Sequence, residues 1–358
     1  MTSGSAPAVE PMLAKAVAAV PDADAVAGGY QYEPKWDGFR AIVSVGGDGE
    51  VEIASRGGKS LVRYFPELVA AFSEQLPDGI VLDGEIVLRR PSSATASGAS
   101  GERLDWEALS ARIHPAASRV ATLADETPAS FVAFDLLHLD GASLLDEPLR
   151  LRREALESAL ADLSAPLHLS RVTRDAELAR RWLAEFEGAG LDGVVAKPLD
   201  GVYAPGKRAM LKIKHARTAD VVLVGYRVHK SGTGVGSLLL GLYDADGELQ
   251  SVGGASAFTT VRRRELIDEL EPLVRRDESG EIVRAEGERN RFSSSKDVSF
   301  VPLEPSRVLE VKYDQMEGPR FRHAVQFARW RPDRDARSCT FEQLEVPAAY
   351  DLGDVLES

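Results

Sequence analysis

The sequence predicts an α+β fold of two domains, of which the second is a small β-barrel. The chain has 358 residues, which is enough for two or three domains with buried cores. Up to Lys214, helical spacings of apolar residues alternate with β-prone runs, whereas the later residues form short β-prone runs broken by Gly and Asp turns. We place the boundary near His215, which gives domains of residues 1–215 and 216–358.

The first domain is expected to contain a hairpin over residues 38–57, because two β-prone runs flank a Gly- and Asp-rich turn. Ser60 then precedes apolar residues at spacings of three and four up to Leu76, which predicts an amphipathic helix capped by Ser60. The small, polar residues 91–101 predict a mobile loop. Further strands are expected at residues 80–88, 131–137, 193–196 and 210–213, with helices at residues 147–163 and 175–188.

The second domain has the element order of a five-stranded barrel of the OB type, which is three strands, a helix and two further strands. Residues 232–236 have the glycine spacing of a phosphate loop, but a strand follows them instead of a helix, so we expect a hairpin tip. The expected strands are residues 219–229, 237–244, 248–254, 308–313 and 324–330, and the expected helix is residues 260–274.

The composition excludes several classes of protein. A formal net charge of -13 and a pI near 5.1 argue against binding to nucleic acid or anionic membranes through overall basicity. Cys339 is the only cysteine, so no intramolecular disulfide is possible, which fits a reducing cytosol. Because no apolar run has the length of a membrane span and the N-terminus lacks a secretory pattern, we expect a cytoplasmic protein without membrane contact. The histidines show no metal-binding spacing.

One segment supplies the basic surface that the whole chain lacks. Between residues 197 and 230, eight Lys and Arg residues stand against only two Asp residues. A focused patch of this kind can bind a phosphate backbone while the acidic remainder prevents indiscriminate coating. The basic residues are Lys197, Lys207, Arg208, Lys212, Lys214, Arg217, Arg227 and Lys230.

The most informative motif is Glu33-Pro34-Lys35-Trp36-Asp37-Gly38-Phe39-Arg40. Its core, K-x-D-G, is a weak signal by itself and could be a simple turn before a strand, but the flanking Glu and Arg make the long form specific. With this motif the chain resembles the covalent nucleotidyltransferases, and among them the ATP-dependent DNA ligases. The family's other blocks follow in the family's order, as Ser55-Arg56-Gly57-Gly58, Leu82-Asp83-Gly84-Glu85, Phe134-Asp135-Leu136-Leu137, Asp192-Gly193-Val194-Val195-Ala196-Lys197, Leu211-Lys212-Ile213-Lys214 and Arg331-Pro332-Asp333-Arg334.

The details are most similar to the stand-alone type C ligases of actinobacteria and the ligase modules of end-joining proteins. The resemblance implies an N-terminal nucleotidyltransferase (adenylation) domain with antiparallel sheets and helices, and a C-terminal OB-fold domain. It also implies that the Lys35 amine attacks the α-phosphate of ATP, so that pyrophosphate leaves and AMP stays on the lysine. A free lysine is almost wholly protonated at neutral pH, so we expect neighbouring cations and a metal to favour its neutral form.

The resemblance also assigns the other site residues. It puts Phe134 against the adenine, and Glu85 and Asp192 at a divalent metal, Mg²⁺ or Mn²⁺, although Asp192 stands where the family usually carries Glu. Arg331 and Arg334 would orient pyrophosphate, with Arg334 where the block commonly ends in Lys. The residues implied to bind the nucleotide are Glu33, Asp37, Arg40, Arg56, Glu85, Phe134, Lys197, Lys212, Lys214, Arg331 and Arg334.

The resemblance implies an ATP-dependent ligase that seals nicks in duplex DNA in three steps. Lys35 becomes adenylated, AMP moves to the 5′-phosphate of the nick, and the 3′-hydroxyl attacks and expels AMP. The implied setting is DNA repair, recombination or replication at the nucleoid of a bacterium, with a monomer acting on nicked DNA. Since little chain precedes Lys35, we expect no separate N-terminal DNA-binding domain, and therefore modest nick affinity or help from DNA-repair proteins.

Two alternatives remain open at this point. The motifs do not specify the base or the 2′-hydroxyl, so an RNA ligase or a capping-type nucleotidyltransferase would share them. A noncatalytic OB-type nucleic-acid-binding module with a degenerate transferase domain is the alternative from another class. The retention of Lys35, Asp37, Gly38, Arg40 and Glu85 argues against such decay, because a noncatalytic protein is free to lose any of them.

Overall fold

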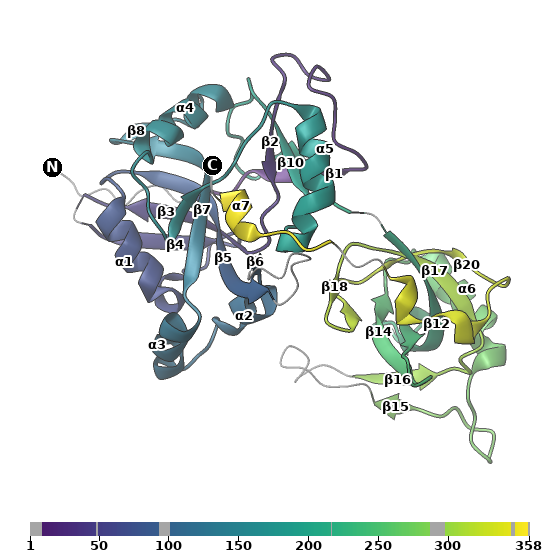
Figure 1. Cartoon of the computed structure of the whole chain (residues 1–358). Coiled ribbons are helices and arrows are strands. Elements are labelled where there is room, and N and C mark those ends of the chain that lie inside the picture. The colour runs from purple at the N-terminus through teal and green to yellow at the C-terminus, as the bar shows by residue number, and fades with distance from the viewer. Residues whose placement is uncertain are drawn as a thin grey trace. The chain divides into compact units, whose positions relative to one another are not determined.

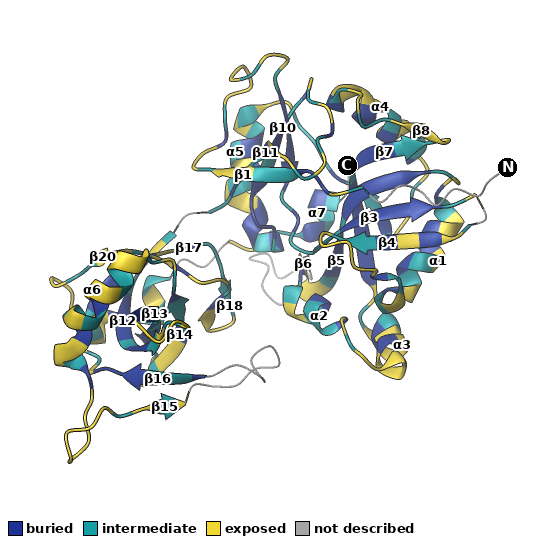
Figure 2. Ribbon diagram, turned by 180° about the vertical axis from the view of Figure 1, so that it is seen from behind, coloured by how far each residue is buried: buried dark blue, intermediate teal, exposed yellow. Residues whose placement is uncertain are grey.

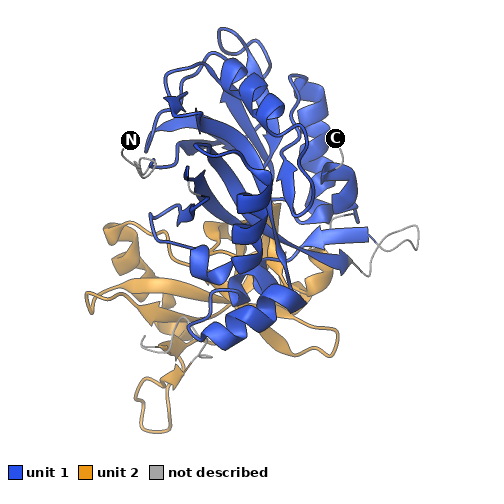
Figure 3. Cartoon of the chain, turned by 90° about the vertical axis from the view of Figure 1, so that its left-hand side faces the viewer, with its two compact units in different colours: residues 1–214, 347–358 blue, residues 215–346 orange. Residues whose placement is uncertain are grey.

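The chain divides into two units, residues 1–214 with 347–358 and residues 215–346 (Figure 3). The computed structural model describes residues 9–47, 49–92, 101–215, 217–286, 298–344 and 348–356, and the loop expected at residues 91–101 lies mostly outside them. The sequence-based ranges of 1–215 and 216–358 put the C-terminal tail in the second domain, whereas in the structure this tail belongs to the first unit.

The first unit contains a larger sheet with the strand order β4-β3-β5-β7-β8, to which β6 adds on β5 and β9 on β7 (Figure 1). All its pairs are antiparallel except β7 with β9. The expected hairpin over residues 38–57 is confirmed as β3 and β4. The strands are β3 (Phe39–Val45), β4 (Val51–Ser55), β5 (Val81–Ser92), β6 (Gly101–Leu104), β7 (Ala129–Leu139), β8 (Ala142–Ser143) and β9 (Leu167–Leu169).

Helices cover one face of this larger sheet. Apolar side chains of the strands pack there against buried residues of three helices, with Phe72 and Phe131 in edge-to-face contact at 5.0 Å between ring centroids. Figure 2 shows the buried strands and the exposed outer surface of α3. The helices of the first unit are α1 (Pro66–Gln75), α2 (Trp106–Ala111), α3 (Ala117–Glu126), α4 (Leu149–Ala159), α5 (Ala176–Glu185) and α7 (Leu352–Leu356).

A smaller sheet with the order β1-β11-β10-β2 lies against the other face of the larger one. Val87 and Val132 of the larger sheet share a core with Tyr32 and Trp182. The chain passes from the smaller sheet to the larger one through residues 35–38, between β2 and β3, so this connection lies at the junction of the sheets. The strands are β1 (Leu13–Val17), β2 (Tyr30–Pro34), β10 (Val194–Pro198) and β11 (Arg208–Ile213).

The helix expected after Ser60 forms, but the predicted cap is wrong. The helix α1 begins at Pro66, after a short 3-10 turn, η1 (Val62–Tyr64), and Phe65 is its N-cap. Pro66 suits the first helical position, and it disfavours a helical conformation for the residue before it. Phe65 accordingly has φ -133° and lies outside the helix. Ser60 instead forms a β-bridge with Ala54.

The second unit is the expected barrel. Strand β12 pairs with β13 and β17, β13 pairs with β14, β17 pairs with β20, and a bridge from Ala255 to Val325 joins β14 to the segment before β20. Its elements are β12 (Arg217–Val228), β13 (Val235–Tyr243), β14 (Leu249–Ala255), α6 (Thr260–Leu270), β17 (Val308–Tyr313) and β20 (Gln326–Trp330), with short strands β15 (Ala285–Glu286), β16 (Ser299–Pro302), β18 (Met316–Glu317) and β19 (Arg320–Phe321).

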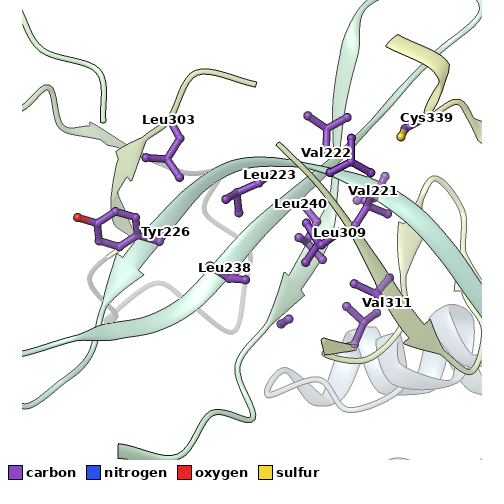
Figure 4. Packing of buried hydrophobic residues seen from close by; sticks show 14 of the residues in the cluster. Val221, Val222, Leu223, Tyr226, Leu238, Leu240, Leu303, Leu309, Val311 and Cys339 are labelled. Carbon is purple, nitrogen blue, oxygen red and sulfur yellow. The ribbon is translucent and has the colours of Figure 1, made fainter. Parts of the chain in front are cut away.

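The barrel core is apolar, and Figure 4 shows residues of β12, β13 and β17 packed within it. Cys339 is fully buried at its edge, as expected for a small structural residue. Residues 232–236 form the expected hairpin tip between β12 and β13, where His229 donates its backbone N–H to the Gly234 carbonyl. In the part of the chain that the structure describes, no helix is long and apolar enough to cross a membrane.

Acid is expected to destabilise the first unit through His168 on β9. Burial, together with the positive charge of Arg89, lowers the pKa of His168 from 6.5 to about 4. The stabilisation by the neutral ring is therefore complete above pH 6.5 and is lost as the pH falls towards 4. In the parent protein the free energy of unfolding, measured in urea, should decrease as the pH falls from about 7 to 4.5. In His168→Leu this decrease should be smaller by roughly 1–3 kcal/mol.

The matched control for this measurement is His114, which is half-buried. His114→Leu should leave the pH dependence of unfolding as it is in the parent protein. If His168→Leu also kept the parent's pH dependence, the titration of His168 would not contribute to acid unfolding.

Candidate active site

Lys35 is held rigidly at the junction of the two sheets. Its backbone N–H donates to the Gly193 carbonyl at 2.8 Å, and its carbonyl accepts from the Asp192 N–H at 2.9 Å. Its ammonium group forms an ion pair with Oδ2 of Asp192, and the Lys214 ammonium lies 3.0 Å from the same oxygen. One nearly buried carboxylate therefore gathers two of the predicted lysines.

The other oxygen of this carboxylate is available for a further contact. Among the described residues, Oδ1 of Asp192 is buried and has no hydrogen-bond partner. A buried carboxylate oxygen without a partner is costly, so this atom is suited to a ligand with positive charge or a hydrogen-bond donor.

Glu85 lies on β5 beside the connection that carries Lys35. Its Oε1 accepts from the Gly38 N–H at 3.1 Å, and a Cβ on Gly38 would lie 2.0 Å from the Ile86 carbonyl oxygen. Gly38 is thus required for the close approach of β3 to β5. Burial raises the pKa of Glu85 to about 7, although the charges of Lys35 and Arg40 act in the opposite direction. Glu85 therefore exchanges its proton near neutrality.

Arg40 is fixed by Asp83, a motif residue for which the sequence implied no role. Its guanidinium donates to both oxygens of the fully buried Asp83, at 2.9 and 2.6 Å. The Tyr203 hydroxyl donates to the same carboxylate at 2.7 Å and accepts from the Met12 N–H at 3.0 Å. Burial opposes the charge on Arg40, but Asp83 outweighs it and raises the pKa of the guanidinium above its ordinary value.

Phe134 lies among the predicted nucleotide-binding residues. The Lys197 ammonium is 4.5 Å from the centre of its ring, and Cζ of Arg40 is 5.4 Å from it. Lys197 also pairs with Glu33 at 2.8 Å, and Gln31 donates to the other oxygen of Glu33 at 2.8 Å. Glu33 and Lys197 are almost completely buried, so they form a fixed polar wall beside Phe134.

Lys212 on β11 completes the positive charge around Lys35. Burial lowers its pKa, and the neighbouring charges of Lys35, Lys214 and Arg56 add to this effect. Arg56 follows β4, and its backbone N–H donates to the Arg40 carbonyl at 3.1 Å. Asp37 lies in the same connection as Lys35, between β2 and β3. The structure thus brings the predicted residues of the first unit together around Lys35.

The donors present fit a divalent cation that is shared with a phosphate ligand. Within the described ranges, no group of three or more His, Cys, Asp or Glu residues could hold a metal ion. A Mg²⁺ site does not require three such side chains, because Mg²⁺ is usually bound by one or two carboxylates together with water and substrate phosphates. Glu85 and the unpartnered oxygen of Asp192 are carboxylate donors near Lys35.

Arg331 and Arg334 belong to the second unit. Nη1 of Arg331 donates to both oxygens of Asp220 at 2.9 Å, and its Nη2 donates to Asp333 at 2.9 Å. The hydrogen bond from Arg331 lowers the pKa of Asp333 to about 2. The basic series at residues 197–230 is likewise divided, because the unit boundary follows Lys214.

Comparison with known proteins identifies relatives over nearly the whole chain. The family model described as ATP dependent DNA ligase domain matches residues 11–214, and the model described as ATP dependent DNA ligase C terminal region matches residues 231–334. DNA ligase C1 of Mycolicibacterium smegmatis is 55% identical over 356 residues, which cover 98% of each chain. DNA ligase C of Mycobacterium tuberculosis is 52% identical over 365 residues, which cover 98% of this chain and 97% of the relative.

A solved structure of the ligase domain of M. tuberculosis LigD is 30% identical to this chain. It covers 93% of this chain and 98% of that domain, with a TM-score of 0.45. The multifunctional non-homologous end joining DNA repair protein LigD of M. tuberculosis is 30% identical over 290 residues, which cover 80% of this chain. The sequence-based expectation of likeness to type C ligases and to the ligase modules of end-joining proteins is therefore confirmed.

Proposed function

The chain belongs to the family of ATP-dependent DNA ligases, and from this premise we propose which of its residues carry out nick sealing. Such ligases use ATP and a divalent metal and act through an enzyme–AMP intermediate. We assign the nucleophile to Lys35. The observation that carries this assignment is the ion-pair cluster of Lys35, Asp192 and Lys214, beside Glu85 and Lys212.

In this proposal the Lys35 amine forms a bond to the α-phosphorus of ATP, and the bond to pyrophosphate breaks. The amine must give up its proton before it can attack, and the neighbouring cations disfavour a second positive charge. Lys212, Lys214 and Arg56 also balance the negative charge of the phosphates during transfer. The rigid backbone bonds of Lys35 support this role, because they keep the nucleophile in one place.

Phe134, Glu33 and Lys197 form the proposed adenine site. The aromatic ring offers a stacking surface, and Glu33 offers an acceptor for the exocyclic amine, which adenine has and guanine lacks at that position. We assign Arg40 and Asp37 to the ribose or to the nicked strand. Arg40 is suited to this by the two hydrogen bonds that hold it against Asp83.

We assign the metal, Mg²⁺ or Mn²⁺, to Glu85 and Asp192. The unpartnered oxygen of Asp192 supports this assignment. Burial raises the pKa of Glu85 to about 7, and a bound cation would favour its charged form. When bound, such an ion supplies positive charge that polarises the phosphate. The role of the protein side chains is to hold Lys35 and the phosphates in line.

Arg331 and Arg334 are proposed to orient the leaving pyrophosphate, as donors supplied by the second unit. The first unit, residues 1–214 with 347–358, is the proposed adenylation domain, and residues 215–346 are the proposed OB-fold domain. We further propose that the protein acts as a monomer on nicked duplex DNA in repair, at the nucleoid. The basic residues from Lys197 to Lys230 support contact with a phosphate backbone.

The test has two measurements. Protein incubated with ATP and Mg²⁺ should gain the mass of one AMP on Lys35, and a chelator such as EDTA should prevent the gain. A panel of nicked duplexes with deoxyribose or ribose at each end of the break should show sealing of DNA ends. Preferential sealing of RNA ends would favour an RNA ligase, and labelling by GTP in place of ATP would favour a capping-type enzyme.

A further inference from the structure

Asp220 on β12 is a charged residue outside the apolar core of the barrel. Its neighbours along the strand, Ala219 and Val221, are buried in the apolar core, so Asp220 lies on the outer face of the same strand. Its side chain is only 15% exposed because other polar groups surround it. The position therefore needs an explanation other than packing of the core.

The backbone of Asp220 is held by a side chain. Oε1 of Gln343 accepts from the Asp220 N–H at 2.8 Å, and Nε2 of Gln343 donates to the Asp220 carbonyl at 3.0 Å. Nε2 also donates to the Thr340 carbonyl at 2.9 Å. On its other side, Asp220 pairs with Glu310 of β17. The backbone that carries this carboxylate is thus held by Gln343 on one side and by β17 on the other.

The Asp220 carboxylate links two arginines, Arg331 and Arg334, to strand β12. Arg331 donates from Nη1 to both carboxylate oxygens at 2.9 Å, although the two residues are 111 positions apart in the chain. Asp333 also binds Arg331, but it lies two residues away on the same segment and cannot tie that segment to β12. A guanidinium held by two carboxylates loses most of its rotational freedom.

Arg334 is held more loosely by the same carboxylate. Its Nε is 3.6 Å from Oδ2 of Asp220, its side chain is 38% exposed, and its Nη2 donates to the Ser338 carbonyl at 3.4 Å. These longer contacts are easily exchanged for a phosphate oxygen. Asp220 therefore keeps Arg331 fixed and Arg334 close to it.

We propose that Asp220 is a positioning residue for the transfer of AMP to Lys35, and that it acts through Arg331 and Arg334 on the pyrophosphate that leaves. The inference rests on the proposed function, because it takes from there the role of the two arginines. Pyrophosphate is present only in the first of the three steps. The effect of Asp220 is therefore confined to that step.

The experiment compares the first step with the last. Asp220→Asn keeps the shape of the side chain but removes its charge and one acceptor. We expect Lys35–AMP formation from ATP and Mg²⁺ to slow by about tenfold or more, while sealing of a nick that already carries 5′-AMP, without ATP, changes by less than about twofold. Asp220→Glu restores a carboxylate and should recover part of the rate.

The control is Glu265→Gln, which removes an ion pair with Arg262 on helix α6 of the same unit. Both reactions should proceed in this variant as in the parent protein. If Asp220→Asn slowed both reactions equally, Asp220 would only support the fold of the unit. Unchanged or faster adenylation would show that the arginines do not depend on it, and either result overturns the inference. Failure of the unsubstituted protein to form Lys35–AMP would instead overturn the proposed function.

Discussion

Replacement of Lys35 by alanine is expected to abolish the enzyme–AMP adduct and ATP-dependent nick sealing. In the proposed mechanism the Lys35 amine takes up AMP, and two backbone hydrogen bonds to residues 192 and 193 hold Lys35 in place. The rate of sealing should fall by at least about a thousandfold. Intact-mass spectrometry after incubation with ATP and Mg²⁺ measures the adduct directly, and a gel assay of a nicked duplex measures sealing.

Thermal unfolding provides the control for this variant. Asp192 keeps its ion pair with Lys214 at 3.0 Å when Lys35 is removed, so the melting temperature should change little. Lys35→Arg is a second control, because it keeps the positive charge but offers no nucleophilic amine. An AMP adduct on Lys212 or Lys214 in either variant would show that the nucleophile has been assigned to the wrong residue.

Replacement of Arg152 by methionine should destabilise the first unit by about 3–5 kcal/mol, because it leaves a buried carboxylate without its positively charged partner. Arg152 on α4 donates to both oxygens of Asp135 at 2.8 and 3.1 Å, with side chains 1% and 2% exposed. It also donates to the carbonyls of Glu147 and Gly201. This loss is a large part of the stability of a typical domain.

Urea unfolding followed by tryptophan fluorescence measures this effect, because Trp36, Trp106 and Trp182 all belong to the first unit. The control is Arg119→Met, which removes an exposed ion pair with Glu126 and should cost less than about 0.5 kcal/mol. Replacing Asp135 by leucine together with Arg152→Met should recover part of the loss. Equal unfolding midpoints for Arg152→Met and Arg119→Met would contradict the prediction.

The larger sheet could be predicted from the sequence, and the smaller sheet only in part. Strands β3, β5 and β7 have the apolar, β-branched runs of a buried strand. Strand β2 was missed because all five of its residues are buried although two of them, Gln31 and Glu33, are polar. Their polar atoms are satisfied by each other and by Lys197, a pairing that no periodicity reveals.

The same limit applies to the candidate site. The sequence was sufficient to predict Lys35, Glu85 and Asp192 as site residues, because each belongs to a motif with a recognisable residue order. The contacts that hold the site residues have no such signal, because they join distant positions, even where a partner such as Asp83 itself stands in a motif. Tyr203 lies 120 residues from Asp83 in the chain, and Asp83 lies 43 residues from Arg40. Only the folded sheets bring these three side chains together.

The last helix, α7, packs on the first unit, where Leu352 and Val355 are buried and the Tyr350 ring lies 5.0 Å from that of Phe186. The chain therefore leaves the first unit after Lys214 and comes back to it, so the barrel is an insertion with two covalent attachments. The two connecting segments, one after Lys214 and one before residue 347, must both change conformation when the barrel rotates. Two connections permit fewer rotations than a single connection would. A protease that cuts one connection leaves the barrel attached through the other, and only two cuts set it free.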